Sequence, residues 1–441
     1  APDLGSGAAR RGGSSPFTRT NSFLRSQKRP TFQRSTFPSA ADDFSERKTS
    51  RASTRCHFMP SFVPSLNCKM SDLSMKKPLR DQNLPAGAIV EEYDDGGALR
   101  NDGVKLRPAN ENPWYVLATV YGEYDFLFRS EIEDKNRRIW NGWMCEGLSA
   151  SERTLLAKTA GLKSEDLSDL IPQEREDLEA ALLKRSKTST LPEAPANIKF
   201  RNTYFAKSMK LNRFIFNRYV DFGFCNFKKS FMCNGSVFDG GLDFEHSEFQ
   251  GNLSLNLTVF ESRAQFQNCY FQEDASFLLS RFNARANFSN SVFAKSTTFV
   301  SVNFLDAVNF SNGAFKGTTN FLAANFWKIP PKFFQRNMHQ DCSFSLQTGN
   351  WPEVTADNAE EGKGIYARLR RIMNDLHKPD DEHFFFRREM ECKALLENSF
   401  DKAFIKGYGM VSDYGYSVMR PIACLSLNVA FGWVTMSAYL E

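Results

Sequence analysis

Phenylalanine recurs along the middle of the chain at alternating intervals of five and six residues. Of the 24 positions in this ladder, 21 are Phe, two are Leu and one is Cys, and the register never slips. A helix face repeats every 3.6 residues and an alternating strand every 2, so neither produces this spacing. A chain that turns a corner every five or six residues does, and four such sides complete one coil of a stack. We therefore predict a repeat β-solenoid with nearly six coils. The ladder is Phe200, Phe205, Leu211, Phe216, Phe222, Phe227, Cys233, Phe238, Phe244, Phe249, Leu255, Phe260, Phe266, Phe271, Phe277, Phe282, Phe288, Phe293, Phe299, Phe304, Phe310, Phe315, Phe321 and Phe326.

A second set of smaller residues lies two positions before the ladder positions. We expect both sets to face inward and the polar residues between them to face water. Each coil of such a stack buries its inner face only against its neighbours, so both ends need covers. The smaller set includes Ser236, Ser247, Cys269, Ser280, Ser291 and Gly313, alternating with Leu242, Leu253, Ala264, Ala275, Ala286 and Val308.

The run ANFSNSVFAKSTTFVSVNF, residues 286–304, resembles the Phe-rich class of pentapeptide-repeat proteins. The resemblance implies a mainly β fold, a right-handed quadrilateral β-helix, which we place at residues 197–327. The chain departs from the family pattern by an extra residue in every second repeat and by Leu211 and Cys233 in the first coils. The residues that we commit to as the structural ladder are Phe244, Phe249, Phe260, Phe266, Phe271, Phe277, Phe282, Phe288, Phe293, Phe299, Phe304, Phe310, Phe315, Phe321 and Phe326.

The chain before the solenoid divides into three parts. Residues 1–69 carry 12 Lys plus Arg against 4 Asp plus Glu among Ser, Gly and Pro, a composition that cannot bury a core. We expect a disordered basic tail or a non-native leader there, with a transit peptide as an alternative, and a linker at 70–104.

Residues 105–191 should form a small mixed α/β region. We predict a strand in Asn112–Glu123 and the end of a helix in Asn136–Ser149. A capping box from Ser149 to Glu152 should start the next helix, and Glu174–Lys184 should be a charged helix. The aromatic residues of this region could line a ligand pocket, but we favour a small aromatic core: Trp114, Tyr115, Trp140 and Trp143.

After the ladder, residues 328–400 should form a cap with amphipathic helices. We expect Trp327–Trp351 to be irregular, and helices at Gly364–Lys378 and Asp380–Glu397 to dock on the solenoid end or on each other. Residues 401–420 are expected to be a juxtamembrane segment.

Residues 421–440 contain no charged side chain and are long enough to span a bilayer. We predict a transmembrane helix, with a buried or interfacial helix as the alternative. Lys402, Lys406 and Arg420 would keep the solenoid cytoplasmic under the positive-inside rule; without a span, the whole chain would be cytoplasmic. Residues 409–421 resemble the junction of bacterial membrane-attached pentapeptide-repeat proteins, where further transmembrane segments, sometimes channel-like, follow. This resemblance implies a possible truncation after Glu441.

No sequence motif indicates catalysis or a cofactor. P-loop, Rossmann, GxSxG and HExxH patterns are all missing from the sequence. A metal at His377 and His383, near Asp380, Asp381 and Glu382, is conceivable, but an acidic helix N-terminus explains the same residues. The cysteines show no CxxC pair, which suggests a reducing compartment; they are Cys56, Cys68, Cys145, Cys225, Cys233, Cys269, Cys342, Cys392 and Cys424. We expect no catalytic, cofactor-binding or metal-binding residues, and interpret Cys225, Cys233 and Cys269 as packing residues.

Charge narrows the choice of partner. From Phe200 to Phe326 there are 12 Lys plus Arg against 9 Asp plus Glu, whereas a topoisomerase-binding DNA mimic needs a strongly negative surface. The net charge of +5 also argues against nucleic acid as a partner. We expect a non-catalytic, membrane-attached interaction module with a protein partner of unknown identity, and a homo-oligomer is possible. The cytosolic regulatory domain of a membrane channel is the alternative.

Overall fold

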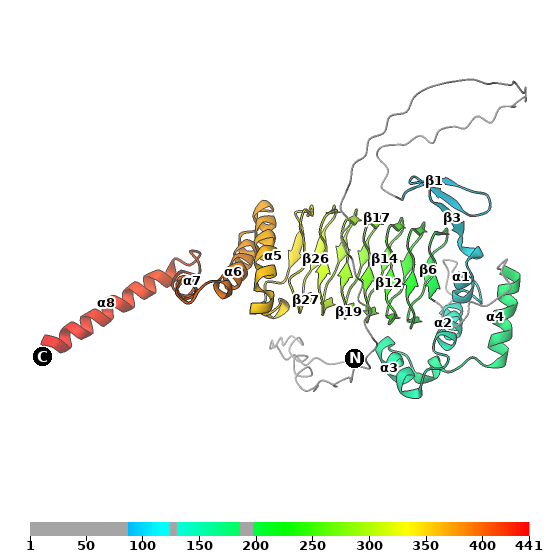
Figure 1. Ribbon diagram of the computed structural model, residues 1–441, viewed down its shortest axis with the longest axis horizontal. Helices are drawn as coiled ribbons and strands as arrows, with labels where there is room; N and C mark the ends of the chain where they lie inside the picture. The colour runs from blue at the N-terminus through cyan, green and yellow to red at the C-terminus, as the bar shows by residue number, and fades with distance from the viewer. Residues whose placement is uncertain (1–86, 124–129, 186–196, 441) are drawn as a thin grey trace, which may run out of the picture. The chain divides into compact units, whose positions relative to one another are not determined.

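The computed structural model describes residues 87–123, 130–185 and 197–440 (Figure 1). From Ile198 to Phe344 the chain winds into a β-solenoid of about seven turns, which confirms the predicted fold. Our expectations for residues 1–69 and for the first part of the linker 70–104 lie outside the described residues.

Four parallel sheets form the sides of the solenoid, and we number these faces in chain order. The first face contains β4 (Ile198–Lys199), β8 (Val220–Asp221), β12 (Leu242–Asp243), β16 (Ala264–Gln265), β20 (Ala286–Asn287) and β24 (Val308–Asn309). The second contains β5 (Thr203–Phe205), β9 (Asn226–Phe227), β13 (Glu248–Phe249), β17 (Tyr270–Phe271), β21 (Val292–Phe293) and β25 (Ala314–Phe315). The third contains β6 (Met209–Lys210), β10 (Phe231–Met232), β14 (Leu253–Ser254), β18 (Ala275–Ser276), β22 (Thr297–Thr298), β26 (Thr319–Phe321) and β28 (Cys342–Phe344). The fourth contains β7 (Ile215–Phe216), β11 (Val237–Phe238), β15 (Val259–Phe260), β19 (Arg281–Phe282), β23 (Asn303–Phe304) and β27 (Asn325–Phe326).

Strands of successive coils pair in a fixed register. Phe238 pairs with Phe260, and Phe260 with Phe282, so that every fourth ladder position returns to the same face, as predicted. The extra residue in every second repeat therefore does not disturb the four-sided coil, because it recurs at the same two sides of every coil.

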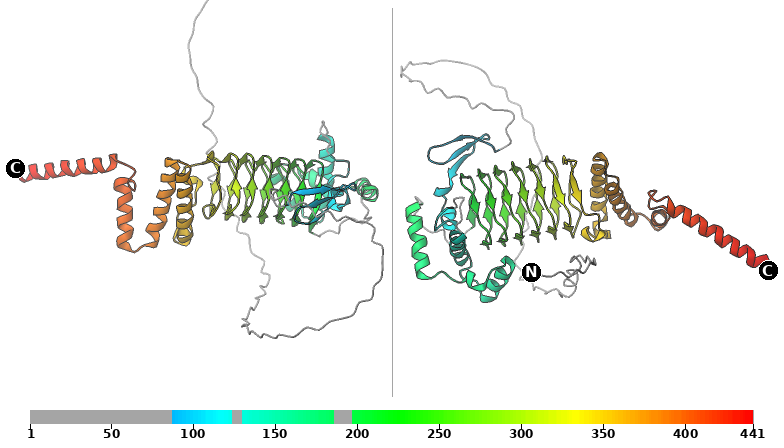
Figure 2. Two further views of the ribbon diagram at one scale, coloured as in Figure 1. Left: turned by 90° about the horizontal axis from the view of Figure 1, so that it is seen from above. Right: turned by 180° about the vertical axis from the view of Figure 1, so that it is seen from behind.

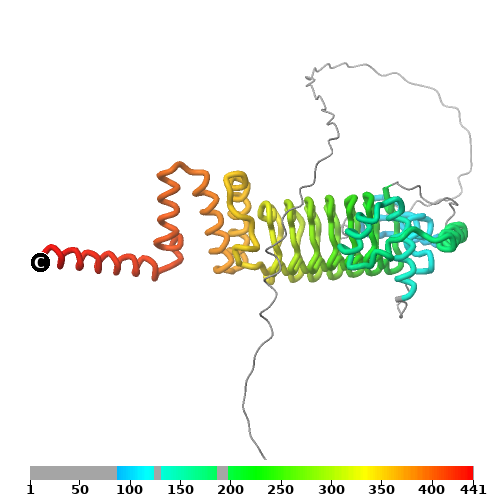
Figure 3. The backbone as a smooth tube through the Cα atoms, turned by 90° about the horizontal axis from the view of Figure 1, so that it is seen from below, coloured from blue at the N-terminus to red at the C-terminus, as the bar shows by residue number. Residues whose placement is uncertain are grey.

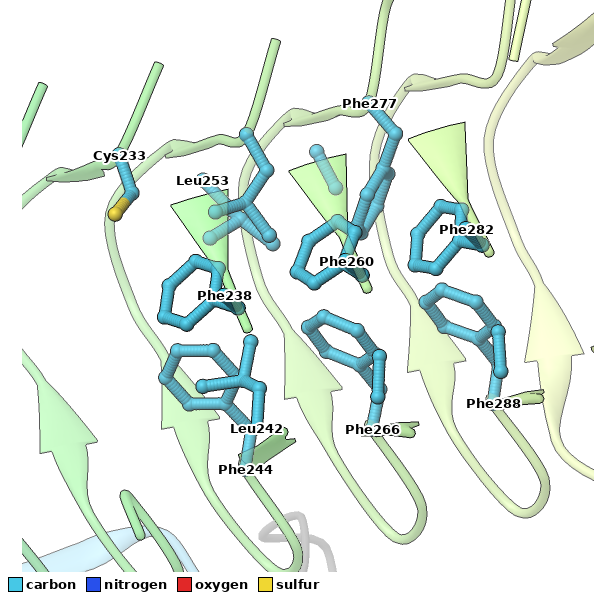
Figure 4. Packing of buried hydrophobic residues seen from close by; sticks show 14 of the residues in the cluster. Cys233, Phe238, Leu242, Phe244, Leu253, Phe260, Phe266, Phe277, Phe282 and Phe288 are labelled. Carbon is cyan, nitrogen blue, oxygen red and sulfur yellow. The ribbon is translucent and has the colours of Figure 1, made fainter. Parts of the chain in front are cut away.

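The ladder residues fill the interior in stacked columns (Figure 4). Phe288 illustrates the packing: it stacks on Phe266 at 4.7 Å and on Phe310 at 5.0 Å between ring centroids. It also meets Phe277 edge-on at 5.4 Å, with an interplanar angle of 89°. Offset stacks within columns and edge-to-face contacts between them are the arrangements that aromatic rings prefer.

The weak first coils of the ladder are explained by an exchange of large and small positions. Where Cys233 occupies a ladder position, Phe231 stands two residues earlier and fills the interior instead. The Phe231 ring meets Phe227 at 4.9 Å and Phe244 at 5.5 Å. A large ring thus still fills this side of the coil, although a Cys occupies the ladder position.

A residue with positive φ recurs every 11 positions along the solenoid. It lies two positions after each ladder residue from which the next ladder residue is five positions away. Such a residue lies at a corner of the coil, between two sides. Asn suits this conformation, but the series also contains Leu257 and Leu279, both with φ of 58°, and a bulky side chain is strained there. The series is Asn202, Arg213, Phe224, Gly235, His246, Leu257, Asn268, Leu279, Asn290, Ser301, Asn312 and Ala323.

Trp327–Trp351 was expected to be irregular, and this prediction was partly wrong. Most of the segment forms one more turn of the solenoid, in which Thr319 of β26 pairs with Cys342 of β28. This turn is one residue longer than the preceding ones. The additional residue falls at Pro330 and Pro331, where Pro cannot donate to the ladder. Short irregular pieces and the helix η3 (Thr348–Asn350) follow.

The N-terminal region differs from prediction in two places. Part of the expected linker 70–104 is a hairpin of β1 (Ile89–Glu92) and β2 (Ala98–Arg100), continued by β3 (Lys105–Pro108), which joins the second face parallel to β5. The strand expected in Asn112–Glu123 was wrong: helix α1 (Pro113–Ala118), preceded by η1 (Ala109–Glu111), occupies half of this range, and no strand lies in it. The Asn112 side chain accepts from the Trp114 amide and Pro113 occupies the first helical position, which together start a helix.

The other helices of this region are α2 (Ser130–Met144), α3 (Ala150–Ala160), η2 (Ser164–Leu167) and α4 (Pro172–Arg185). The capping box of Ser149 and Glu152 is present. Trp140 is buried and its indole N–H donates to the Ile215 carbonyl at 2.9 Å. The aromatic cluster of Trp114, Trp140 and Trp143 is therefore a packed core that covers the first end of the solenoid.

Helices α5 (Ala356–Asp375) and α6 (Pro379–Leu396) cover the other end (Figure 2). Phe385 of α6 meets Phe344 at 5.9 Å and Trp351 at 5.0 Å, so the expected docking on the solenoid end is confirmed. Helices α7 (Ser399–Ser412) and α8 (Met419–Leu440) follow. Helix α7 was not predicted; Asn398 starts it by accepting from the amides of Phe400 and Asp401.

Candidate interaction surfaces

The small inward positions form a ladder of hydrogen-bond donors. Ser236 donates to the Leu211 carbonyl at 2.6 Å, and Ser247 and Cys269 make the equivalent bonds at 2.7 and 3.0 Å, each to the residue 25 positions earlier. Burial raises the pKa of the Cys225 thiol to about 12, so this cysteine stays protonated and is not a nucleophile. The protonated, buried thiol is consistent with the packing role that we expected for the cysteines. The structure shows in addition that Cys269 donates a hydrogen bond to a backbone carbonyl.

Arg336 ends this ladder. It occupies the equivalent small position in the last turn, is only 2% exposed, and its guanidinium lies 4.0 Å from the centroid of the Phe315 ring. It donates to the carbonyls of Phe310 at 3.0 Å and Phe288 at 3.3 Å. Gly313, one turn earlier, has no side chain that could donate a hydrogen bond to the Phe288 carbonyl. Arg336 extends past Gly313 and donates to that carbonyl instead.

Two of the four faces are partly covered by the chain itself. On the second face the hairpin brings Arg100, 1% exposed, to within 2.6 Å of the His246 carbonyl. Beside it Glu248 is fully buried and accepts from Asn226 at 2.7 Å and Gln272 at 2.5 Å. Burial raises the pKa of the Glu248 carboxyl.

The fourth face is covered by α2 and α3. Asn141 of α2 donates to the Arg213 carbonyl at 3.1 Å and accepts from the Ile215 amide at 2.9 Å. Val237 packs with Ala157 of α3.

The first face remains open and carries a polar groove of about 410 Å³. Arg263 and Arg285 line it on adjacent turns, and neither has an ion-pair partner within 4 Å among the described residues. An acidic cavity of about 610 Å³ adjoins it, with Asp243 and Glu261 in its wall. Charges of both signs thus lie on this open face, and no paired nucleophile and base stand among the groove residues.

The third face is also open, and its outer side chains are mostly small and polar. Ser254 donates to Asn234 at 2.7 Å, and the same arrangement recurs one turn on. Its edge toward the fourth face carries exposed leucines: Leu257 is 58% exposed, Leu279 50% and Leu322 44%.

The histidines of the described chain do not converge on a metal. His246 stacks on Phe224 at 4.7 Å, with Glu245 at 3.3 Å. His377 follows α5, whereas His383 lies within α6 and accepts from Arg387 at 3.1 Å. Among the described residues no group of three or more His, Cys, Asp or Glu side chains could hold a metal ion.

One polar joint connects α6 with α7 and α8. Asp413, 8% exposed and with φ of 53°, ends α7 and accepts from Arg387 of α6. Arg420 in the first turn of α8 lies 3.7 Å from its other oxygen. The His383 ring stacks on Tyr416 at 3.6 Å, and burial together with the Arg387 charge lowers the pKa of His383.

Helix α8 is the one described helix that is long and apolar enough to span a membrane. It has 22 residues, a mean hydropathy of 1.4 and no buried residue in its most apolar stretch. Its exposed side chains include Leu425, Leu427, Phe431 and Trp433.

Comparison of the chain with protein-family models, with curated proteins and with solved structures finds no significant match. The repeat β-solenoid therefore stands on its own geometry.

Proposed function

We propose that the chain is a non-catalytic interaction module of the pentapeptide-repeat class, held at a membrane by α8, with the solenoid on the cytoplasmic side as the surface that binds a protein partner. The coil geometry supports the class, since each four-sided coil corresponds to four repeats of five or six residues, each with one large and one small inner residue.

The observation that carries the proposal is that α8 buries none of its residues. A soluble helix of this composition buries an apolar face in a core, but nothing among the described residues covers α8. About 20 apolar residues cross the hydrocarbon core of a bilayer, which would take this surface out of water.

The polar side chains of α8 are compatible with hydrocarbon. Ser426 donates to the Ile422 carbonyl at 2.9 Å and Asn428 to the Cys424 carbonyl at 2.8 Å. Thr435 and Ser437 make the same bond to carbonyls one turn earlier. Each of these side chains thus donates a hydrogen bond within its own helix, which lowers the cost of placing it in hydrocarbon. Lys402, Lys406 and Arg420, all before the span, favour a cytoplasmic solenoid.

Carbonate extraction of membranes from expressing cells tests the anchor. The full chain should resist extraction, whereas a chain without residues 421–441 and the double variant Leu427→Lys, Val434→Lys should be released. Leu183→Lys, at an exposed leucine of α4, is the matched control and should stay in the membrane. Release of the unmodified chain by carbonate would contradict the proposal and would make α8 a protein-binding helix.

A further inference from the structure

Helix α7 presents a largely exposed apolar face, on which the Tyr408 ring meets Tyr414 at 5.9 Å. Phe400 is 80% exposed and Phe404 70%, while Tyr408 and Val411 are 44% and 43% exposed. These four residues are spaced by four, four and three positions, which places them on one side of a helix. Exposed aromatic residues arranged in this way mark a binding surface rather than scattered surface apolarity.

The opposite side of α7 is occupied. Ile405 is buried, and Lys406 borders a cavity with Glu391 and Leu395 of α6. The solenoid cap therefore packs on one side of α7 and leaves the aromatic side free. Asp401 borders that aromatic side, whereas Lys402 and Lys406 lie away from it.

The turn after α7 fixes how this surface relates to α8. Asp413 joins Arg387 of α6 to Arg420 of α8, and α8 leaves the turn crosswise to α7, on the side away from α6 (Figures 2 and 3). If α8 crosses a bilayer, α7 runs along the bilayer surface. Val418 and Met419, each 72% exposed, continue the apolar surface into α8.

We infer that α7 is an interfacial helix, whose Phe400, Phe404, Tyr408 and Val411 side chains enter the boundary between lipid headgroups and acyl chains. This inference rests on the proposed membrane anchor and adds a second lipid-binding element to it. Aromatic side chains favour that depth. The partner of this surface is thus a lipid bilayer.

Bromolipid quenching of tryptophan tests the depth of each helix separately. The full chain is reconstituted into phosphatidylcholine vesicles containing phosphatidylglycerol, with bromine carried either near the carbonyl end or near the methyl end of the acyl chain. Phe404→Trp adds a reporter on α7. Leu155→Trp, at a 65% exposed leucine of α3, is the matched control, and Trp433→Phe isolates the emission of α8.

The emission added by Phe404→Trp should be mostly lost with bromine near the carbonyl end and should change less with bromine near the methyl end. That of Leu155→Trp should not change with either lipid. If Trp433 is quenched but the reporter at position 404 is not, α8 is an anchor and the inference about α7 is overturned; a protein partner or a second copy would then cover α7. Stronger quenching from the methyl end would overturn the interfacial placement, and no quenching of either helix would overturn inference and anchor together.

Discussion

Truncation of Phe288 to Ala should disrupt the solenoid core more than almost any other single change. The ring is fully buried, stacks on two rings at 4.7 and 5.0 Å, and meets Phe277 and Phe299 edge-on at 5.4 and 5.6 Å. Phe→Ala in a core costs about 3 to 5 kcal/mol, and each aromatic pair adds about 0.5 to 1.5 kcal/mol beyond burial. With four such pairs we expect the upper part of this range, about 4 to 5 kcal/mol.

The loss should also be local, because each coil of a solenoid contacts only its neighbours. Hydrogen–deuterium exchange of the full chain in detergent micelles reports this coil by coil. The amides of Phe266 and Phe310 donate to the next coil and should exchange about a thousandfold faster, since about 1.4 kcal/mol corresponds to tenfold. The amide of Phe205, several coils away, should change much less.

Phe288→Leu is the matched control, because it keeps most of the volume and should cost less than half as much as the truncation. A cost below about 1 kcal/mol for Phe288→Ala, on the scale where core truncations cost several times more, would refute the stacked-core reasoning. Equal acceleration in every coil would refute the local, nearest-neighbour part of it.

Two further predictions concern the corners and the covered face. Leu279→Asn replaces a residue that tolerates positive φ poorly and should stabilise the chain by about 0.5 to 1 kcal/mol in denaturant titrations. Asn290→Leu, at an equivalent corner, should destabilise the chain by a similar amount. The opposite order of stabilities would contradict the strain argument. Burial raises the pKa of Glu248 above its ordinary 4.5, so the folded chain binds this proton more tightly than the unfolded chain, and stability should fall as pH rises from 4.5 through the folded pKa. In Glu248→Gln this part of the pH dependence should vanish; an unchanged slope in pH-dependent unfolding would show that Glu248 is not its source.

The interior of the solenoid was predictable because one physical rule, a large inner side chain at each side, repeats in every coil. Its last turn was not recognised, because the extra residue at Pro330 and Pro331 shifts the spacing by one. Phe333 and Phe344 continue the columns of Phe310 and Phe321 at that larger spacing. A search that tolerated one insertion could have found them.

The errors outside the repeat come from short local signals. Asn112 followed by Pro113 is a helix start, but the apolar residues that follow favoured a strand. The hairpin β1–β2 turns at Asp94–Gly97, a turn signal that could have identified it. The interaction surfaces were not predictable, because which faces stay open depends on where α2, α3 and the hairpin dock, and these contacts join residues far apart in sequence.

The end of the solenoid is connected to the orientation of α7 and α8 through a series of contacts. Nothing in a repeating coil by itself ends the repeat, and in this chain Gly313 and Arg336 interrupt the ladder of donors. Gly313 has φ of 71°, and a Cβ at this position would lie 2.2 Å from the Ser291 carbonyl oxygen. The Arg336 guanidinium makes no ion pair within 4 Å in the described part of the chain, burial lowers its pKa to about 9, and it still carries its charge at neutral pH. Carbonyl oxygens and the Phe315 ring stabilise that charge only while the last turn keeps its longer register. The same register sets Phe344 and Trp351 against α6, whose Arg387 holds Asp413 between α7 and α8. The orientation of both candidate membrane helices relative to the rod therefore depends on how the last coil is closed.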